Sequence, residues 1–248
     1  PGAGRRWRGM PIPRHTPGVI KTLALIIRRP DLDRAGFRGH YESIHAPLAL
    51  PLMRGLERYV RYHVEEVLHG EIRFDVLTAF WYRDAEATRE MLAQLDGEAG
   101  KAIREDELTF MDKPANTFFT VSERRLQDGI EGDSSIFVLV AKPEEMTRLE
   151  CSRELVRDRL PGLLQGLEAS TFVLLRDAFP VAERPLPWNA VVQIGADRVP
   201  ALGSFAKACE SEGYRVVSVR TRRFETDLES RSSSRSGLEA QSATSDQS

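Results

Sequence analysis

Short apolar runs alternate along the chain with segments of helical spacing. The first run, VIKTLALII at 19–27, is partly β-branched and ends at an Arg-Arg-Pro turn, which is typical of a buried strand. Three further strands are expected at 56–64, 73–82 and 117–123. Helices are expected from Asp33 to about His45, at 84–95 and at 101–108. The resulting order, β-α-β-β-α-β, is the ferredoxin-like or split βαβ plan.

The same plan repeats in the second half of the chain. Strands are expected there at 136–141, 169–176, 190–194 and 214–222, and helices at 143–159 and 199–212. The tripeptide Gly-Leu-Glu at 55–57 recurs at 166–168, an offset of 111 residues that matches a whole unit. A tandem duplication is the simplest explanation.

Two such units predict an α+β fold. If the helices of each unit cover one face of its sheet, the two remaining faces can be buried against each other, which gives tandem ferredoxin-like units in an intramolecular α+β barrel. The expected domains are 19–127 and 134–225. The flanks at 1–18 and 226–248 lack apolar periodicity, so we expect a disordered arm and a disordered tail.

The end of the first helix carries candidate catalytic residues. Apolar residues recur at helical spacing from Phe37 to Leu48, and Pro47 disfavours helical geometry just before it, so the helix should stop near His45. His45 suits acid or base chemistry because imidazole titrates near neutral pH. Tyr41 lies one turn earlier on the same side and could share a substrate oxygen. The structural alternatives are a histidine at a helix C-terminus and a core aromatic.

A metal site on this helix is not expected. His40 and His45 are five residues apart, which turns them by about 140° on an α-helix, away from a common face. The HExxH spacing is absent, and no cysteine pattern suggests zinc. Glu42 could orient His45, or it could form an exposed pair with it.

Polar and aromatic residues on two strands are candidate substrate-binding residues. Tyr59, Arg61 and His63 share one face of the second strand, and Trp81 shares a face with Asp75 on the third. An Arg and a His that point into a barrel are costly to bury unless they bind a ligand or pair. We therefore expect these residues to line one cavity, with packing or surface pairing as the alternative.

Composition and charge disfavour some classes of binding partner. The net charge of −2 is spread over mixed charges, which disfavours nucleic acid and anionic membranes. There is no membrane-length apolar run and no signal peptide, so a cytoplasmic setting is expected. No phosphate loop, GxSxG elbow or Rossmann fingerprint occurs, so we expect a small-molecule substrate and no cofactor. A homodimer of the whole chain is left open.

Several segments of the sequence together resemble the EthD family. They are IKTLALIIRRP, FRGHYESIHAPLALPL, RYVRYHV, the strand from Phe74 to Tyr82 and the acidic turn at 106–112. That family belongs to the dimeric α+β barrels, in which two chains usually supply the two units. The resemblance implies a fused pseudo-dimer and points to His45. At the 111-residue offset Val156 takes the place of His45, so one active pocket per chain is expected.

The expected function is a cofactor-independent enzyme of the lyase, isomerase, dehydratase or cyclase type, acting on an aromatic or carbonyl-bearing metabolite in catabolism. His45 would move a proton, Tyr41 would polarise an oxygen, and Trp81 and Tyr59 would pack the ring. A cofactor-free oxygenase is a close variant, as the resemblance implies. The alternative is a non-catalytic protein that binds a metabolite or haem, with His45 or His63 as the haem ligand.

Overall fold

The fold is seen in a computed structural model that describes residues 19–128, 132–167, 170–178 and 188–228. The predicted N-terminal arm and residues 229–248 of the predicted tail lie outside these ranges. Within the described ranges, no helix has both the length and the apolar composition needed to cross a membrane.

Eight strands close into one barrel in the order β1-β3-β2-β8-β5-β7-β6-β4. Their bounds are β1 Ile20–Ile26, β2 Leu56–His69, β3 Val76–Tyr82, β4 Thr117–Gln127, β5 Ser134–Ala141, β6 Ser170–Ala178, β7 Ala190–Ile194 and β8 Arg215–Glu225. Each lies on an apolar run from which the sequence predicts a strand. β2 continues past its expected end because it pairs antiparallel with β8 of the other half, as far as His69.

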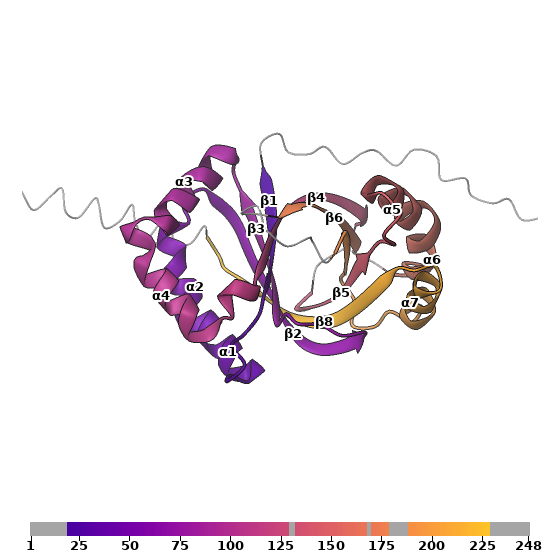
Figure 1. Cartoon of the computed structure of the whole chain (residues 1–248), viewed down its shortest axis with the longest axis horizontal. Coiled ribbons are helices and arrows are strands. Elements are labelled where there is room, and N and C mark those ends of the chain that lie inside the picture. Colours follow the sequence, from indigo (N-terminus) through magenta and orange to yellow (C-terminus); the bar gives the residue numbers. More distant parts are fainter. Residues whose placement is uncertain (1–18, 129–131, 168–169, 179–187, 229–248) are drawn as a thin grey trace, which may run out of the picture.

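The two halves join through two antiparallel strand pairs, β2 with β8 and β4 with β6. All eight strands therefore have a neighbour on both sides, and no sheet edge is left open. Figure 1 shows α1 to α4 on one side of the strands and α5 to α7 on the opposite side. The predicted intramolecular α+β barrel is confirmed.

The helical segments follow in chain order. They are α1 Arg34–His40, a first π-turn Tyr41–His45, α2 Ala46–Ala49, a 3₁₀ turn Leu50–Leu52, α3 Ala85–Asp96, a 3₁₀ turn Glu98–Gly100, α4 Lys101–Phe110, a 3₁₀ turn Lys113–Ala115, α5 Arg148–Glu154, a second π-turn Leu155–Arg159, α6 Leu160–Leu163 and α7 Leu202–Glu210. The helix predicted from Pro143 begins later, because Thr147 and Glu150 form a reciprocal capping box there.

The prediction that the first helix stops near His45 is wrong. Helical structure continues through α2 and the following 3₁₀ turn to Leu52. The π-turn has widened the backbone just before the proline, and the Ala46 N–H bonds to the Tyr41 carbonyl five residues back. Pro47 then falls in the first turn of α2, where its missing N–H is tolerated.

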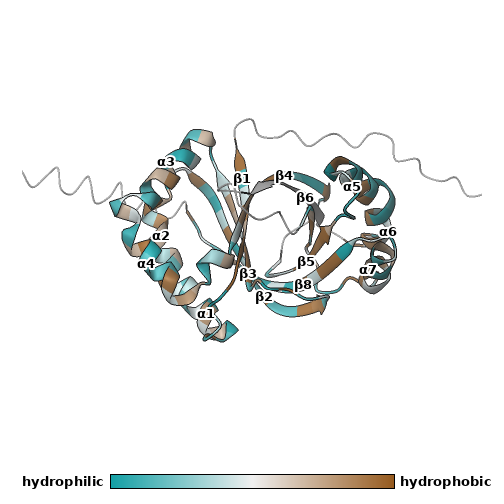
Figure 2. Cartoon of the chain, in the orientation of Figure 1, coloured by the Kyte–Doolittle hydropathy of each residue, from teal (hydrophilic) through white to brown (hydrophobic). Residues whose placement is uncertain are grey.

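Three apolar clusters form the core. One fills the barrel and draws on strands of both halves, and the other two lie between each half's helices and its sheet. Along β2 the alternation is clear: Val60 and Tyr62 belong to the barrel cluster, whereas Tyr59 belongs to the cluster under the helices. In Figure 2 the helices carry both teal and brown segments, as expected for elements with one buried face.

The duplication is visible as two π-turns, each followed by a residue and then proline. Aligning the turns gives an offset of 114 (155 minus 41), whereas the left-handed glycines Gly55 and Gly166 keep the offset of 111. Three residues therefore separate the two alignments. In the helix, Arg159 takes the place of His45, and the assignment of Val156 to that place is wrong.

Candidate functional site

The candidate residues lie between the helices and the outer face of β2 and β3. Tyr41 packs under the helices, and Tyr59, Arg61 and His63 reach the same layer from β2. All four side chains are buried. Because the barrel interior holds its own apolar cluster, the expectation that this face lines a cavity inside the barrel is wrong.

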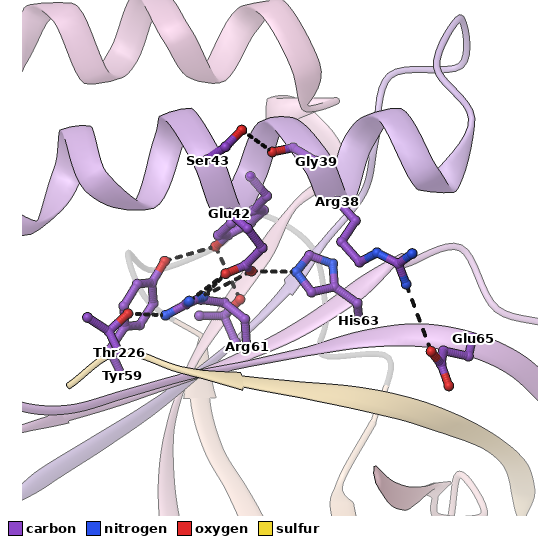
Figure 3. A network of polar contacts seen from close by, with 11 residues as sticks. Arg38, Gly39, Glu42, Ser43, Tyr59, Arg61, His63, Glu65 and Thr226 are labelled. Atoms are coloured by element: carbon purple, nitrogen blue, oxygen red, sulfur yellow. Dashed lines mark hydrogen bonds and ion pairs between the residues drawn. The ribbon is translucent and has the colours of Figure 1, made fainter. Parts of the chain in front are cut away.

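Glu42 is the centre of a buried polar network in this layer (Figure 3). The Arg61 guanidinium donates to both carboxylate oxygens, with Nη2 2.5 Å from Oε2 and Nε 3.1 Å from Oε1. His63 Nε2 lies 2.7 Å from Oε1. Arg61 Nη1 also donates to Thr226 Oγ1 at 2.6 Å, so the first residue of the predicted tail belongs to the network.

This network fixes the charge state of Glu42. Burial alone would raise the pKa of Glu42, but hydrogen bonds from His63 and Arg61 outweigh burial and hold the pKa below its usual value. Glu42 is therefore an acceptor, and His63 Nε2 carries the donated proton. Glu42 points to β2 and serves His63 and Arg61 rather than His45.

Asp106 on α4 binds two histidines. Its Oδ2 lies 2.9 Å from His45 Nδ1, and its Oδ1 lies 2.7 Å from His40 Nε2. The two histidines thus converge although the α-helical angle places them apart, because a π-turn brings residues five apart to the same side. That part of the prediction is wrong, and Asp106 was missed although the EthD-like stretch at 106–112 includes it.

The Asp106 contact sets the tautomer of His45. A carboxylate only accepts, so Nδ1 donates to Asp106 and Nε2 carries the lone pair. Burial lowers the pKa of His45, and the hydrogen bond to Asp106 offsets this only in part. His45 is consequently a neutral imidazole at pH 7, the form that can accept a proton.

Two tyrosines adjoin the histidines. Tyr41 OH lies 3.2 Å from Thr78 Oγ1, and Tyr59 OH donates to Tyr41 OH at 3.4 Å. The Tyr41 ring centroid is 5.2 Å from that of His45 and 5.5 Å from that of His63. Burial raises the pKa of both phenols, so they remain protonated hydrogen-bond donors.

Trp81 and Asp75 do not share a cavity, contrary to prediction. Trp81 packs with the barrel cluster, and its ring lies under Lys21 Nζ at 4.3 Å. Asp75 Oδ1 accepts from Arg28 Nε and Arg34 Nε, each at 3.1 Å. Asp75 lies just before β3, and its carboxylate reaches arginines near the end of β1 and at the start of α1. Because Asp75 is outside the strand, side-chain alternation along β3 does not predict which way its side chain points.

In the second half, an ion pair takes the place of the two histidines, since Glu154 aligns with His40 and Arg159 with His45 at the offset of 114. Arg159 donates to Glu154 Oε1 at 2.5 Å and also pairs with Glu212. The chain's five histidines all precede the second half, at 15, 40, 45, 63 and 69. Cys151 is buried nearby, and burial raises the pKa of its thiol to about 11, which excludes a reactive thiolate.

Metal ligation finds no support in the part of the chain that the structure describes. Nowhere in it do three or more His, Cys, Asp or Glu side chains gather as a metal site would need. Asp106 with its two histidines is the nearest approach, and both histidines hydrogen-bond to that carboxylate.

Comparison with known proteins gives a domain match over part of the chain and a likeness in fold to solved structures. Residues 29–114 match the EthD domain model. No curated protein sequence gives a significant match. An anthrone oxidase-like protein is 11% identical, with 84% of this chain and 93% of that chain aligned and a TM-score of 0.51. A candidate monooxygenase from Fusobacterium nucleatum is 10% identical over 85% and 95% of the two chains, with a TM-score of 0.50.

A protein of the EthD family from Bacillus halodurans is 25% identical, covers 41% of this chain and 95% of its own, and has a TM-score of 0.33. The first two structures align with most of this chain and show that its fold is that of the α+β barrels.

Proposed function

We propose that the part of the chain that matches the EthD domain model, residues 29–114, is a cofactor-independent acid–base enzyme for a small aromatic or carbonyl-bearing metabolite. The observation that supports it best is the 2.9 Å contact between Asp106 Oδ2 and His45 Nδ1. A carboxylate that holds one imidazole nitrogen fixes the tautomer and leaves the other nitrogen to act as the base.

Tyr41 supplies the second group of the proposed mechanism. Its hydroxyl remains protonated and lies in the same layer as the His45 ring, so it can polarise a substrate carbonyl while His45 removes a proton from the adjacent carbon. Tyr59 holds the Tyr41 hydroxyl in place. Reactions of each of the lyase, isomerase, dehydratase and cyclase classes can begin with such a proton transfer.

Anthrone is a suitable first probe because it is an aromatic ketone with an acidic C–H bond, and because one fold neighbour is described as anthrone oxidase-like. We expect the protein to accelerate exchange of that hydrogen in D₂O, followed by NMR. His45→Gln should slow the exchange by about 10²- to 10⁴-fold, the usual contribution of a general base. His69→Gln is the control and should leave the exchange rate unchanged, because His69 pairs with Glu210 outside the site. An unchanged rate in His45→Gln contradicts the proposal.

Oxygen uptake during the same reaction distinguishes an oxygenase from the other classes. A substrate carbanion that reacts with O₂ consumes oxygen in proportion to turnover, whereas an isomerase or lyase does not. The name of the Fusobacterium neighbour motivates this second readout.

Burial of the site favours one competing function, a non-catalytic binding protein. Tyr41 is 2% exposed and His45 is 5% exposed, so a substrate must open the layer to reach them. Wild-type protein that binds anthrone without accelerating exchange would support this alternative. A Soret band on titration with haem, lost in His45→Gln or His63→Gln, would identify haem as the ligand.

A further inference from the structure

A cavity of about 300 Å³ opens beside the start of α1, at the end of the Glu42 network opposite to Thr226. Its lining includes Arg34, Phe37, Arg38, His63, Glu65 and Asp75. Neither His45 nor Tyr41 lines it, so it is distinct from the proposed proton-transfer site. Its volume is at the lower end of the range for small-molecule sites, which suits a single-ring compound.

His63 lines this cavity and carries an unused hydrogen-bond acceptor. The residue is 2% exposed, and its Nδ1 atom is buried without a partner among the described residues. Because Nε2 donates its proton to the Glu42 carboxylate, Nδ1 carries a lone pair. Buried polar atoms are rarely left unpaired, so this nitrogen calls for a donor such as a hydroxyl group.

The charged side chains that line the cavity are two arginines, Arg34 and Arg38, and two carboxylates, Asp75 and Glu65. Arg28 and Arg34 share one carboxylate, Asp75, at 3.1 Å each. Arg38 Nη1 lies 3.9 Å from Glu65 Oε1. Both side chains are more than a third exposed, at 35% and 40%. Asp75 is thus shared by two guanidinium groups, one of them outside the lining, whereas Arg38 has only the long contact with Glu65.

Arg38 is the guanidinium best placed to bind a ligand anion. Figure 3 shows it descending from α1 beside His63 toward Glu65. Its ion pair with Glu65 is at the outer distance limit and is solvated, so a ligand carboxylate can replace or share it at little cost. A guanidinium can bind a carboxylate through two parallel hydrogen bonds.

We propose that this cavity binds a small aromatic hydroxy acid, whose hydroxyl donates to His63 Nδ1 while its carboxylate pairs with Arg38 and its ring lies against Phe37. The site is independent of the chemistry proposed for His45. Glu42 acts as a positioning residue, because it fixes the His63 tautomer that accepts the hydroxyl.

Calorimetric titration with 3-hydroxybenzoate and 4-hydroxybenzoate tests the site, with benzoate and phenol as probes that each lack one of the two groups. For the wild-type protein we expect at least one hydroxybenzoate to bind tenfold or more tightly than either benzoate or phenol. This preference follows from simultaneous contact with His63 and Arg38.

Two variants assign the contacts. Gln at position 63 can still donate to Glu42 but has no counterpart of Nδ1, so His63→Gln should weaken hydroxybenzoate binding at least tenfold and leave benzoate binding unchanged. Arg38→Met removes the charge and keeps an apolar stem, and should reduce hydroxybenzoate affinity to that of phenol. Thermal unfolding of each variant verifies that it is folded.

Three control variants should retain the wild-type affinity for hydroxybenzoate. They are His69→Gln, Arg157→Met on the exposed second π-turn, and His45→Gln. Retained binding in His45→Gln separates this site from the proposed catalytic one, so either proposal can fail alone. The cavity proposal is overturned if no hydroxybenzoate binds more tightly than benzoate and phenol, or if folded His63→Gln binds it as well as the wild type does.

Discussion

His45 Nδ1 lies 2.9 Å from Asp106 Oδ2, although the two residues are 61 positions apart in the chain. The contact joins the π-turn to α4, and the same carboxylate also binds His40. A histidine held in this way has a fixed tautomer and a fixed ring orientation, which are the properties that proton transfer needs.

Asp106→Asn should lower the pKa of His45 further. Burial lowers that pKa, and Asp106 raises it through its hydrogen bond and its charge. Without the charge of Asp106, burial lowers the pKa by more. NMR titration of the His45 ring carbons measures the shift. A His45 pKa that rises or stays constant in Asp106→Asn would show that the carboxylate does not act on His45.

The free energy of unfolding should fall as the pH drops below about 6.5. Burial lowers the pKa of both His45 and His63 from the ordinary value of 6.5, so the unfolded chain binds more protons below that pH. Each histidine contributes a slope of at most about 1.4 kcal/mol per pH unit, present above pH 6.5 and lost as pH falls through the folded-state pKa. Glu42, whose pKa is also lowered, adds to the loss only at more acidic pH.

Urea unfolding between pH 7.5 and 5 measures this slope. The double variant His45→Gln/His63→Gln removes both groups and should show a flatter dependence than the wild type in this range. An equally steep dependence in the double variant would assign the effect to other groups.

Glu42→Gln should destabilise the protein by about 2–3 kcal/mol, because it leaves the buried Arg61 without a counter-charge. Glu86→Gln is a matched control, since its pair with Arg89 is exposed and should contribute little. Replacing Glu42 and Arg61 together by leucine should cost less than Glu42→Leu alone, which a double-mutant cycle measures. Additive effects would exclude coupling between them.

Deletion of Ser43 should convert the first π-turn into regular α-helix and separate the two histidines on Asp106. Ser43 is exposed, so the deletion removes no core contact. In the wild type, Asp106→Asn should change the NMR chemical shifts of the His40 and His45 rings, because both contact that carboxylate, whereas in the deletion background it should change those of only one ring. Deleting Arg157 from the second π-turn is the control and should leave the chemical shifts of both rings as they are.

Three glycine substitutions should change the free energy of unfolding by amounts that differ in sign and size. Gly39→Ala should stabilise by about 0.5–1 kcal/mol, because the site is helical and an added Cβ meets nothing within 4 Å. Gly166→Ala should cost about 1 kcal/mol for its φ of +74° alone. Gly55→Ala should cost more, since its Cβ would also lie 2.5 Å from that of Ala87. Thermal unfolding gives the order, and equal costs at 55 and 166 would contradict it.

Local patterns were enough to predict the strands and their duplication. Runs such as 19–27 are apolar and partly β-branched, and the chain must bury them, so an α+β barrel could be predicted from two repeats of one plan. The same reasoning identified Tyr59, Arg61 and His63 as one face of β2, because side-chain alternation on a strand is local.

Only the tertiary structure decided which groups meet. The partners of His45 and His63 are carboxylates on other elements, Asp106 on α4 and Glu42 on the helix above β2, and no spacing in the sequence encodes such distances. The π-turn also changes the angular count on which the prediction for His40 and His45 rested, since a proline signals a break but not a widened turn. The sequence by itself determined the barrel and the polar face of β2. The packing of the helices on the sheet decided which polar groups meet on that face, because those contacts join residues far apart in the chain.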